Sequence, residues 1–372
     1  MRRTLIIQPT LPSYRVDLFE RLGALLTRDE GALWVHYAER DYLGVGVAQQ
    51  LPRGVRLSTK RYYSGGLLKK TPLSYPALPF EALMWAEVLV IPGHLHELEV
   101  ALSASIAKLR GLRVIWWGSF PSEGALKRRV RLWAAGRCQG VATYMPSQRE
   151  GLPKELRSRA RSLNNGLKPL SLPPETPKLS ERPLGVAVIG RPSPKSKIKQ
   201  WLMTLSEWRG GAIQIHLIGT SEADLAPMSL DPPPEVELYA HGYVEGEAEL
   251  LELLARCRVS FYPGAMGLSL MEGIRAGLPT LLAGPPAPHM PEFELFIEGE
   301  LGRHFSSDEH PNEEWPRWPE ALGAMLHDLA WLDDAQARCL AQGEAFSTKV
   351  MAERLYELIC GVGSCEPDTT GG

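Results

Sequence analysis

Long apolar runs are absent from this 372-residue sequence. Its most apolar stretch, residues 82–91, is interrupted by Glu87 and ends at Pro92, whereas a membrane-spanning helix needs about 20 consecutive apolar residues. Near the N-terminus only residues 4–7 form an apolar run before Gln8, which is too short for a signal peptide. We therefore expect no transmembrane segment and a cytoplasmic location.

Cysteine is also scarce. The five cysteines form no C-x-x-C pair, and their odd number argues against a disulfide framework. We expect reduced thiols at Cys138, Cys257, Cys339, Cys360 and Cys365.

The chain as a whole has almost no excess of positive or negative charge, but its two halves differ in net charge. The chain carries 41 Lys and Arg against 43 Asp and Glu, a net charge of −2 that does not favour nucleic-acid binding. Residues 1–180 hold 27 basic and 14 acidic side chains, and residues 181–372 hold 14 and 29. The length favours two domains, and the change of sign indicates that the halves have different partners.

Both halves alternate short apolar runs with helical patterns, which predicts doubly wound α/β domains with parallel sheets. The strands expected in the first half are residues 4–7, 33–37, 88–91, 114–117 and 141–144, and the helices are residues 14–26, 97–110 and 126–135. Those expected in the second half are strands 184–189, 213–218, 236–239 and 259–262, and helices 197–208, 247–255 and 268–276.

The domain boundaries follow from composition. Residues 168–183 contain five prolines without apolar periodicity and are predicted to be a linker. The predicted parts are an N-terminal domain, a linker, a C-terminal domain, a last helix and a disordered tail. Their bounds are residues 1–167, 168–183, 184–335, 336–360 and 361–372.

Loops after the carboxyl ends of parallel strands are where such domains bind ligands. In the second half, Gly264 and Gly267 follow a predicted strand and a helix begins at Leu268. Glycines let the backbone approach a ligand, and a helix N-terminus favours phosphate. Glu272, one turn inside, can accept hydrogen bonds from two vicinal hydroxyls, as on a ribose. The alternative is a simple turn followed by a solvated glutamate.

A basic loop follows another strand of the same predicted sheet. Residues 189–199 contain Arg191, Lys195, Lys197 and Lys199 within an otherwise acidic half. Arg and Lys are the residues that neutralise a diphosphate, although a solvated basic loop is the alternative. Because both loops would share one sheet edge, together they predict a nucleotide-diphosphate site.

This combination resembles the GT-B glycosyltransferases of the large retaining family 4. The resemblance implies two Rossmann-like domains facing a cleft and a last helix that crosses back to the first domain. The first half resembles a subgroup that acts on lipid-linked or nascent bacterial polysaccharide. The motifs are VIGRPSPKSK, HGYVEGEAELLELLARCRVSFYPG, GLSLMEGIRAGLPT and GEAFSTKVMAERLYEL in the second half, and IIQPTLPSYRVDLFERL, VLVIPGHLHELE, VIWWGSFPSEG, VATYMPSQREGL and LNNGLKP in the first.

The resemblance also implies roles for individual residues on the donor side. Arg191 with Lys195 or Lys197 would contact the donor diphosphate, and Glu272 the ribose. The residues with implied catalytic roles are Arg191, Lys197 and Glu272, and the donor-binding set is Gly190, Arg191, Lys195, Lys197, Tyr243, Gly264, Gly267, Leu268, Ser269 and Glu272. The chain departs from the family at Gly264, where a first glutamate usually contacts the donor sugar, and this leaves reduced or abolished activity open.

On the acceptor side, the resemblance places three loops of the first half around the cleft. The implied acceptor residues are Pro12, Tyr14, Arg15, His94, Trp117 and Ser119. Trp116 and Trp117 are neighbours in one predicted strand, so at most one of them faces the cleft.

The implied reaction retains the anomeric configuration and uses neither a metal nor another cofactor. The sequence contains no D-x-D motif, and the basic loop with the helix N-terminus can neutralise the leaving diphosphate. His94, His96 and Glu97 form H-x-H-E, which without further ligands is better interpreted as a polar loop than as a zinc site.

A basic stripe in the first half predicts a further partner. Lys127, Arg128, Arg129 and Arg131 lie among apolar residues, which suits an anionic membrane surface that carries a lipid-diphosphate acceptor. A peripheral position on the inner face of the cytoplasmic membrane would follow, while a solvated helix face is the alternative.

The hypothesis is therefore a glycosyltransferase of bacterial surface polysaccharide biosynthesis that uses a nucleotide-sugar donor and a glycan or lipid-linked acceptor. Two alternatives stay open. One is a nucleotide-sugar epimerase of the same fold, and the other is a degenerate GT-B protein that binds nucleotide sugar or glycan without turnover.

Overall fold

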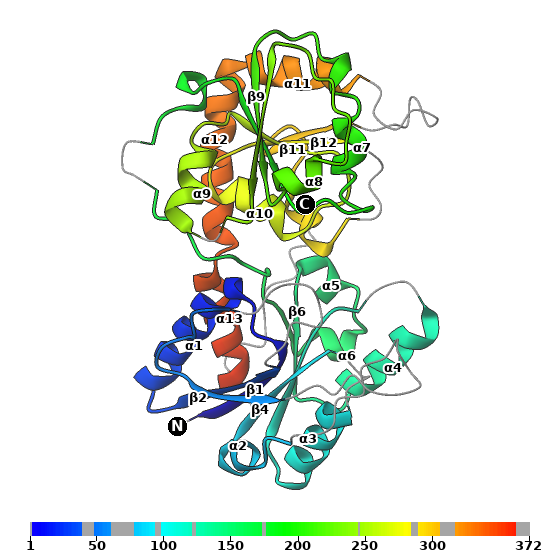
Figure 1. The fold of residues 1–372 in the computed structure, drawn as a ribbon. Helices are drawn as coiled ribbons and strands as arrows, with labels where there is room; N and C mark the ends of the chain where they lie inside the picture. The colour runs from blue at the N-terminus through cyan, green and yellow to red at the C-terminus, as the bar shows by residue number, and fades with distance from the viewer. Residues whose placement is uncertain are drawn as a thin grey trace. The chain divides into compact units, whose positions relative to one another are not determined.

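The computed structural model describes residues 2–38, 48–60, 78–93, 98–120, 124–172, 176–244, 246–283, 289–305 and 317–361. The chain forms two compact units (Figure 1). Unit 1 comprises Met1–Lys168 and Phe346–Gly372, and unit 2 comprises Pro169–Ala345.

Unit 1 contains a seven-stranded sheet with the order β3-β2-β1-β4-β5-β6-β7, in which all paired strands are parallel. The strands are apolar on both faces; Leu5, Ile6 and Ile7 of β1, for example, are fully buried. This is typical of parallel sheets covered by helices on both sides. The strands are β1 (Arg3–Thr10), β2 (Ala32–Ala38), β3 (Arg56–Lys60), β4 (Val88–Pro92), β5 (Arg113–Trp117), β6 (Gly140–Thr143) and β7 (Ala160–Ser162).

Helices cover both faces of this sheet (Figure 1). One core lies beneath α1 and α13, and the other lies beneath α2, α3 and α6. The helices are η1 (Ser13–Arg15), α1 (Val16–Arg28), α2 (Phe80–Trp85), α3 (Leu98–Leu109), α4 (Ala125–Ala135), α5 (Pro146–Glu150), α6 (Lys154–Arg157) and α13 (Thr348–Cys360).

Unit 2 contains a six-stranded sheet, also with parallel pairs, in the order β10-β9-β8-β11-β12-β13. Its first and fourth strands, β8 and β11, are neighbours, as are β1 and β4 in unit 1. The strand order therefore reverses between them, and this switch point is where doubly wound sheets bind ligands. The strands are β8 (Gly185–Ile189), β9 (Ile213–Ile218), β10 (Val236–Gly242), β11 (Val259–Tyr262), β12 (Thr280–Ala283) and β13 (Gly302–Phe305).

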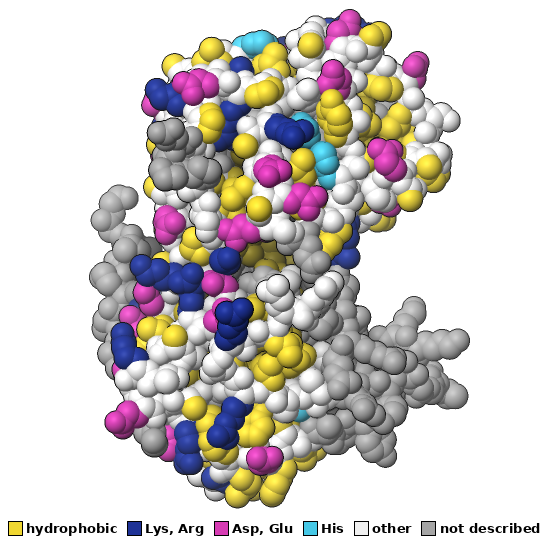
Figure 2. Space-filling view, turned by 60° about the vertical axis from the view of Figure 1, so that its left-hand side comes forward, with side chains coloured by type: hydrophobic (Ala, Val, Ile, Leu, Met, Phe, Trp, Pro, Cys, Tyr) yellow, Lys and Arg dark blue, Asp and Glu magenta, His cyan; other side chains and the backbone are white. Residues whose placement is uncertain are grey.

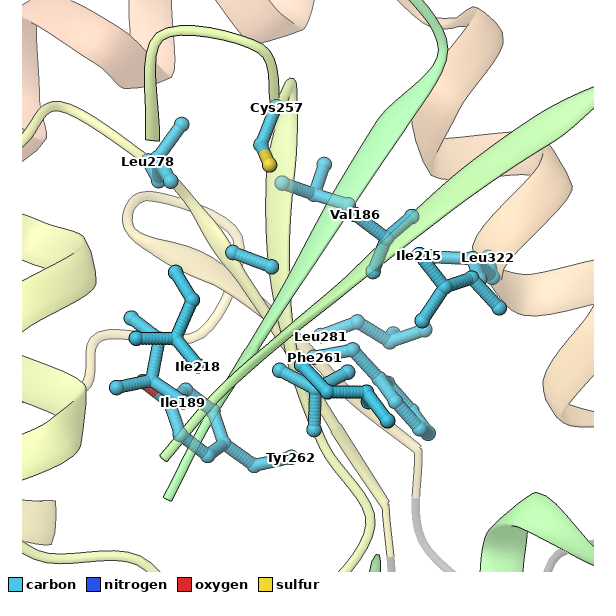
Figure 3. Close-up of a cluster of buried hydrophobic side chains, with 14 of the residues drawn as sticks. Val186, Ile189, Ile215, Ile218, Cys257, Phe261, Tyr262, Leu278, Leu281 and Leu322 are labelled. Carbon is cyan, nitrogen blue, oxygen red and sulfur yellow. The ribbon is translucent and has the colours of Figure 1, made fainter. Parts of the chain in front are cut away.

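The core of unit 2 joins this sheet to its helices (Figure 3). Trp201 of α7 packs against Phe261 of β11 and Trp318 of α11, with ring centroids 4.8 and 5.4 Å apart. These aromatic contacts hold α7 and α11 to the sheet. The helices are η2 (Leu179–Glu181), α7 (Ile198–Leu202), η3 (Leu205–Glu207), α8 (Glu222–Leu225), α9 (Glu247–Leu254), α10 (Leu268–Arg275), η4 (Pro291–Leu295), α11 (Trp318–His327) and α12 (Leu329–Ala345).

The last helix expected from the sequence is two helices. The pattern predicted one helix over residues 336–360, whereas α12 ends in unit 2 and α13 begins in unit 1. The break lies at Ser347, whose side chain caps α13 by accepting a hydrogen bond from the Val350 amide. The next amide, that of Thr348, donates to the Leu167 carbonyl of unit 1 at 2.9 Å.

The proline-rich segment is not a free linker. Its described part packs onto unit 2, because Leu179 is fully buried in the core there. Ser180 donates from its amide and its hydroxyl to the Asp333 carboxylate of α12, at 3.0 and 2.8 Å. The proline-rich segment is therefore a connection whose described part is packed on unit 2.

Several elements differ from the predictions. The helix expected over residues 197–208 stops at Leu202 and continues as η3. Strands β3, β7, β12 and β13 were not predicted. Of the expected tail, only Gly361 belongs to the described residues. On the face drawn in Figure 2, hydrophobic side chains are dispersed among charged ones.

Candidate functional site

A cavity of about 460 Å³ opens at the switch point of the unit 2 sheet. The loops that follow β8 and β11 form its walls, and its size is typical of small-molecule sites. Ile189 and Tyr262, the last residues of these two strands, are among its lining residues and are labelled in Figure 3. The other lining residues are Val188, Gly190, Arg191, Pro192, Ser193, Lys195, Ser196, Ile198, Pro263, Gly264, Ala265, Met266, Gly267, Ser269 and Met290.

The loop after β8 is held by two serines that cap each other. The Ser193 amide donates to Ser196 Oγ at 2.9 Å, and the Ser196 amide donates to Ser193 Oγ at 3.0 Å. Ser196 Oγ also donates to the Arg191 carbonyl at 2.9 Å. This turn places Arg191 and Lys195 on the cavity wall, while Lys197 follows in the left-handed conformation (φ 52°) and is not a lining residue.

The loop after β11 packs its backbone against the first loop. The Ala265 amide donates to the Lys195 carbonyl at 2.8 Å. A Cβ on Gly264 would lie 2.5 Å from that carbonyl oxygen and 2.8 Å from the carbonyl carbon of Ser196. A glutamate at position 264 therefore does not fit this arrangement, which gives a steric reason for the glycine.

Helix α10 begins at the cavity. Gly267 is its N-cap residue, and Gly267 and Ser269 both line the cavity. The amides of a first helical turn have no partners within the helix and attract anions. Tyr262 is buried, which raises the pKa of its phenol, and its hydroxyl donates to the Ser269 carbonyl. This bond fixes the first turn of α10 to the end of β11.

Glu272 lies one turn further along α10 and outside the cavity lining. Its side chain is 24% exposed and pairs with Arg275, whose Nε lies 2.7 Å from Glu272 Oε2. Glu272 is thus near the cavity, partly accessible and already oriented by a cation.

The remaining donor-side predictions divide. Gly190 lines the cavity, and its φ of 151° explains the glycine. Its amide donates a hydrogen bond to the Ile218 carbonyl. Leu268 and Tyr243 are not lining residues; Tyr243 follows β10 and is 75% exposed.

The electrostatics of the cavity favour an anion. Arg191 and Lys195 are exposed at its wall, and none of the described lining residues is acidic. Together with the N-terminus of α10, this arrangement can bind the phosphates of a nucleotide.

The sequence pattern missed Met290, which lines the cavity from beyond β12. Its amide donates to the Met266 carbonyl at 2.9 Å, and the Met266 amide donates to Nδ1 of His289 at 3.4 Å. No local motif surrounds these residues, so only the folded chain relates them to the site.

In unit 1, Arg15 is buried rather than open to an acceptor. Its side chain is 6% exposed, it donates to Asn165, and its Nη1 lies 2.9 Å from the Met351 sulfur. Its guanidinium carbon also lies 5.4 Å from the Trp117 ring centroid. Arg15 therefore links η1 to α13 and to the end of β5. Pro12 is buried, whereas Tyr14 and Ser119 are half-buried.

Neither Trp117, the predicted acceptor residue, nor its neighbour Trp116 is open to solvent in this structure. Trp117 is 3% exposed and Trp116 is 1% exposed. They point to opposite faces of the sheet, as expected for neighbours in a strand, but helices cover both faces and each ring joins a core. His94, like His96 and Glu97, lies outside the described residues.

Of the four residues in the basic stripe on α4, two are bonded to backbone carbonyls and two are exposed. Arg128 donates to the Gly151 carbonyl at 2.9 Å and Arg131 to the Ser119 carbonyl at 3.2 Å, so both are tied to the protein. Lys127 and Arg129 are exposed. An apolar row at helical spacing lies beside them, at Leu126 (74% exposed), Val130 (42%) and Trp133 (60%).

An ion cluster at the carboxyl edge of the unit 1 sheet also escaped the sequence analysis. Lys60 Nζ and His36 Nε2 lie 3.3 and 3.5 Å from the Glu99 carboxylate, and all three side chains are at most 3% exposed. The three residues are far apart in sequence, so no spacing indicated their contact.

Within the described ranges, no group of three or more His, Cys, Asp or Glu side chains could hold a metal ion. No helix in those ranges is both long and apolar enough to cross a membrane. Cys138, Cys257, Cys339 and Cys360 are free, and burial raises the pKa of the first three to about 12.

Solved glycosyltransferases resemble this chain in structure. A glycosyltransferase from Rickettsia africae ESF-5 is 12% identical with a TM-score of 0.64, over 96% of this chain and 99% of that one. The lipopolysaccharide outer core galactosyltransferase WaaB is 11% identical with a TM-score of 0.58, over 96% and 99%. TarM of S. aureus, in complex with fondaparinux, α-GlcNAc-glycerol and UDP, is 8% identical with a TM-score of 0.58, over 96% and 100%.

No protein-family model matches the chain, and no curated protein matches it significantly. At these low identities the structural likeness shows the fold alone. The two parallel, Rossmann-like sheets with their helices give the chain the GT-B fold.

Proposed function

We propose that the chain is a glycosyltransferase that uses a nucleotide-diphosphate sugar bound in unit 2. The observation that carries this proposal is the cavity between the ends of β8 and β11, where Arg191, Lys195 and the N-terminus of α10 converge. A diphosphate between these groups would be neutralised by two side-chain cations and by helix amides. UDP is named in the TarM complex, which supports a nucleotide donor.

The proposed reaction retains configuration and needs no metal. The bond from the sugar C1 to the leaving phosphate oxygen breaks, and the acceptor oxygen bonds to C1 on the same face. The acceptor proton passes to the departing phosphate oxygen, so no separate base is required. Arg191 and Lys195 would stabilise the charge that develops on the diphosphate. Lys197 is next in sequence to lining residues but does not itself line the cavity. In this proposal it adds positive charge near the diphosphate and makes no direct contact with it.

The acceptor in this proposal is a glycan or a lipid-linked sugar of bacterial surface polysaccharide biosynthesis, held by unit 1. Tyr14 and Ser119 of unit 1 are half-buried and therefore partly accessible. We propose that these two residues contact the acceptor. Arg15 and Trp117 are buried, and in this proposal they have a structural role.

The donor proposal is tested by calorimetric titration of the full chain with UDP, GDP, ADP and their sugars. One nucleotide should bind, and Glu272→Ala should weaken its binding, because the half-buried side chain is assigned to the ribose. Wild-type affinity in Glu272→Ala would remove that assignment. A donor that binds but is neither hydrolysed nor transferred would favour the alternative of a GT-B protein that binds nucleotide sugar without turnover. Gly264, in place of the usual glutamate, is the feature that supports this alternative. Interconversion of the donor sugar would favour the epimerase.

We also propose that α4 contacts the anionic inner face of the cytoplasmic membrane. The α4 surface, defined as Leu126, Lys127, Arg129, Val130 and Trp133, combines exposed apolar side chains with two exposed cations. Apolar side chains can enter the headgroup boundary while Lys and Arg attract anionic lipid.

Sedimentation of the full chain with phosphatidylglycerol and phosphatidylcholine vesicles tests the α4 surface. Lys127→Glu should weaken binding to phosphatidylglycerol by about tenfold, and Trp133→Ser should weaken it further. Lys349→Glu, an equal charge change at an exposed position of α13, should bind like the wild type. Equal binding of all variants would refute the membrane contact.

A further inference from the structure

Glu272 and Arg275 form an ion pair that uses only one of the two carboxylate oxygens. Arg275 Nε donates to Glu272 Oε2 at 2.7 Å, and Arg275 Nη2 contacts the same oxygen. Glu272 Oε1 accepts no hydrogen bond from any described residue. The carboxylate is therefore oriented through one oxygen while the other can receive a further donor.

Burial restricts the cation of this pair more than the carboxylate. The Arg275 side chain is 12% exposed, and that of Glu272 is 24% exposed. The backbone of Arg275 is packed against α12, because a Cβ on Gly343 would lie 2.8 Å from the Arg275 Cα. Arg275 is thus fixed by close helix packing, and Glu272 is the more accessible partner.

The pair lies next to the cavity through the geometry of α10. Residues three apart on a helix share one face, and Ser269, three residues before Glu272, lines the cavity. The row from Ser269 through Glu272 to Arg275 therefore runs along one face of α10, from the cavity to the contact with α12. A charge-assisted bond from Arg275, at the end of this row, holds the carboxylate in the middle.

We propose that Arg275 is a positioning residue, which holds the Glu272 carboxylate through Oε2 so that Oε1 can accept the ribose hydroxyls of a nucleoside diphosphate. This inference rests on the proposed function. A flexible glutamate loses side-chain freedom when it binds a ligand, whereas a carboxylate that is already oriented does not. Arg275 would therefore strengthen recognition of the ribose and leave recognition of the diphosphate unchanged.

The test compares ribonucleotides with deoxynucleotides on the full chain. Whichever of UDP, GDP and ADP binds the wild type is titrated together with its 2′-deoxy and 3′-deoxy forms. The wild type should bind the ribonucleotide about tenfold more tightly, as expected for the loss of one hydrogen bond to a charged group. In Arg275→Met this ratio should fall towards one, while affinity for the deoxynucleotides stays the same.

Two further variants separate positioning from simple stabilisation. Arg275→Lys keeps the cation and should recover part of the ratio, and Glu272→Gln should lose the ratio as Arg275→Met does. If Arg275 only joins α10 to α12, Arg275→Met weakens both nucleotides equally and keeps the ratio, which overturns the inference. Failure of the wild type to bind any nucleotide would instead contradict the proposed function, and this inference with it.

Discussion

Gly264 and Lys195 are in backbone contact across the mouth of the unit 2 cavity. The Ala265 amide donates to the Lys195 carbonyl at 2.8 Å, and a Cβ on Gly264 would lie 2.5 Å from that oxygen. Real Cβ atoms do not approach an oxygen so closely, so this contact requires glycine. It joins the loop after β8 to the loop after β11 and so sets the distance between the cavity's cationic wall and the N-terminus of α10.

We expect Gly264→Ala to separate these two loops. The added methyl group should lower the free energy of unfolding by about 1–3 kcal/mol and weaken binding of a nucleoside diphosphate. Gly323→Ala is the matched control, since Gly323 lies inside α11 with its nearest outside atom 3.9 Å from a Cβ, and alanine favours a helix. Urea denaturation and calorimetry measure both effects. Unchanged nucleotide affinity in Gly264→Ala would show that the loop contact does not shape the site.

Charge at the cavity wall should matter more than charge nearby. Lys195 lines the cavity, whereas the exposed Lys199 lies on α7 outside it. Lys195→Ala should weaken nucleoside-diphosphate binding by about tenfold and reduce its dependence on salt, because one cation no longer contacts the phosphates. Lys199→Ala makes the same change in net charge and should have little effect. Equal effects of the two variants would indicate a diffuse attraction and no specific contact.

The sequence predicts the regular part of the fold because apolar runs and helical periodicity are local signals. Strands β1, β2, β8 and β9 lie where their buried runs predict them. Both edge strands of the unit 1 sheet were missed for physical reasons: β3 is largely polar, with the sequence Arg56–Lys60, and β7 has only three residues. Their pairing depends on a neighbouring strand more than on their own composition.

For the site, the sequence indicates which residue types lie at the sheet edge but not their environment. The glycines and cations of the two loops could be predicted, because loops after parallel strands share an edge. The partner of Glu272 and the contact of Met290 with the Gly267 region depend on packing. The burial of Trp117 and Arg15 could not be predicted for the same reason, since α13 returns from the end of the chain to cover them.

The burial of Arg15 leads to a stability prediction. Arg15→Met removes its bond to Asn165 and its contact with the Trp117 ring, and should lower the free energy of unfolding by about 2–4 kcal/mol. Arg28→Met is the control, because the Arg28 side chain is 67% exposed and exposed ion pairs contribute little. Urea denaturation compares the two. If Arg15→Met is as stable as the wild type but loses transfer to an acceptor, the acceptor role implied by the sequence is correct.

His216 should make unit 2 less stable in acid. It is 1% exposed, and burial, together with His241 and Arg256, lowers its pKa from 6.5 to about 4. Between these two values the unfolded chain binds a proton that the folded chain does not, so the free energy of unfolding falls as the pH falls. The loss should reach about 3 kcal/mol by pH 4.

The variant His216→Gln removes this titration and keeps a group that can bond to His241, whose ring nitrogen lies 3.0 Å from His216 Nδ1. Its unfolding free energy should therefore depend less on pH between 6.5 and 4, with a residual slope from His241, whose pKa burial also lowers. His327→Gln changes an exposed histidine and should keep the wild-type slope. Urea denaturation of the three proteins at half-unit steps of pH measures the slopes, and the same slope in His216→Gln as in the wild type would place the acid sensitivity elsewhere.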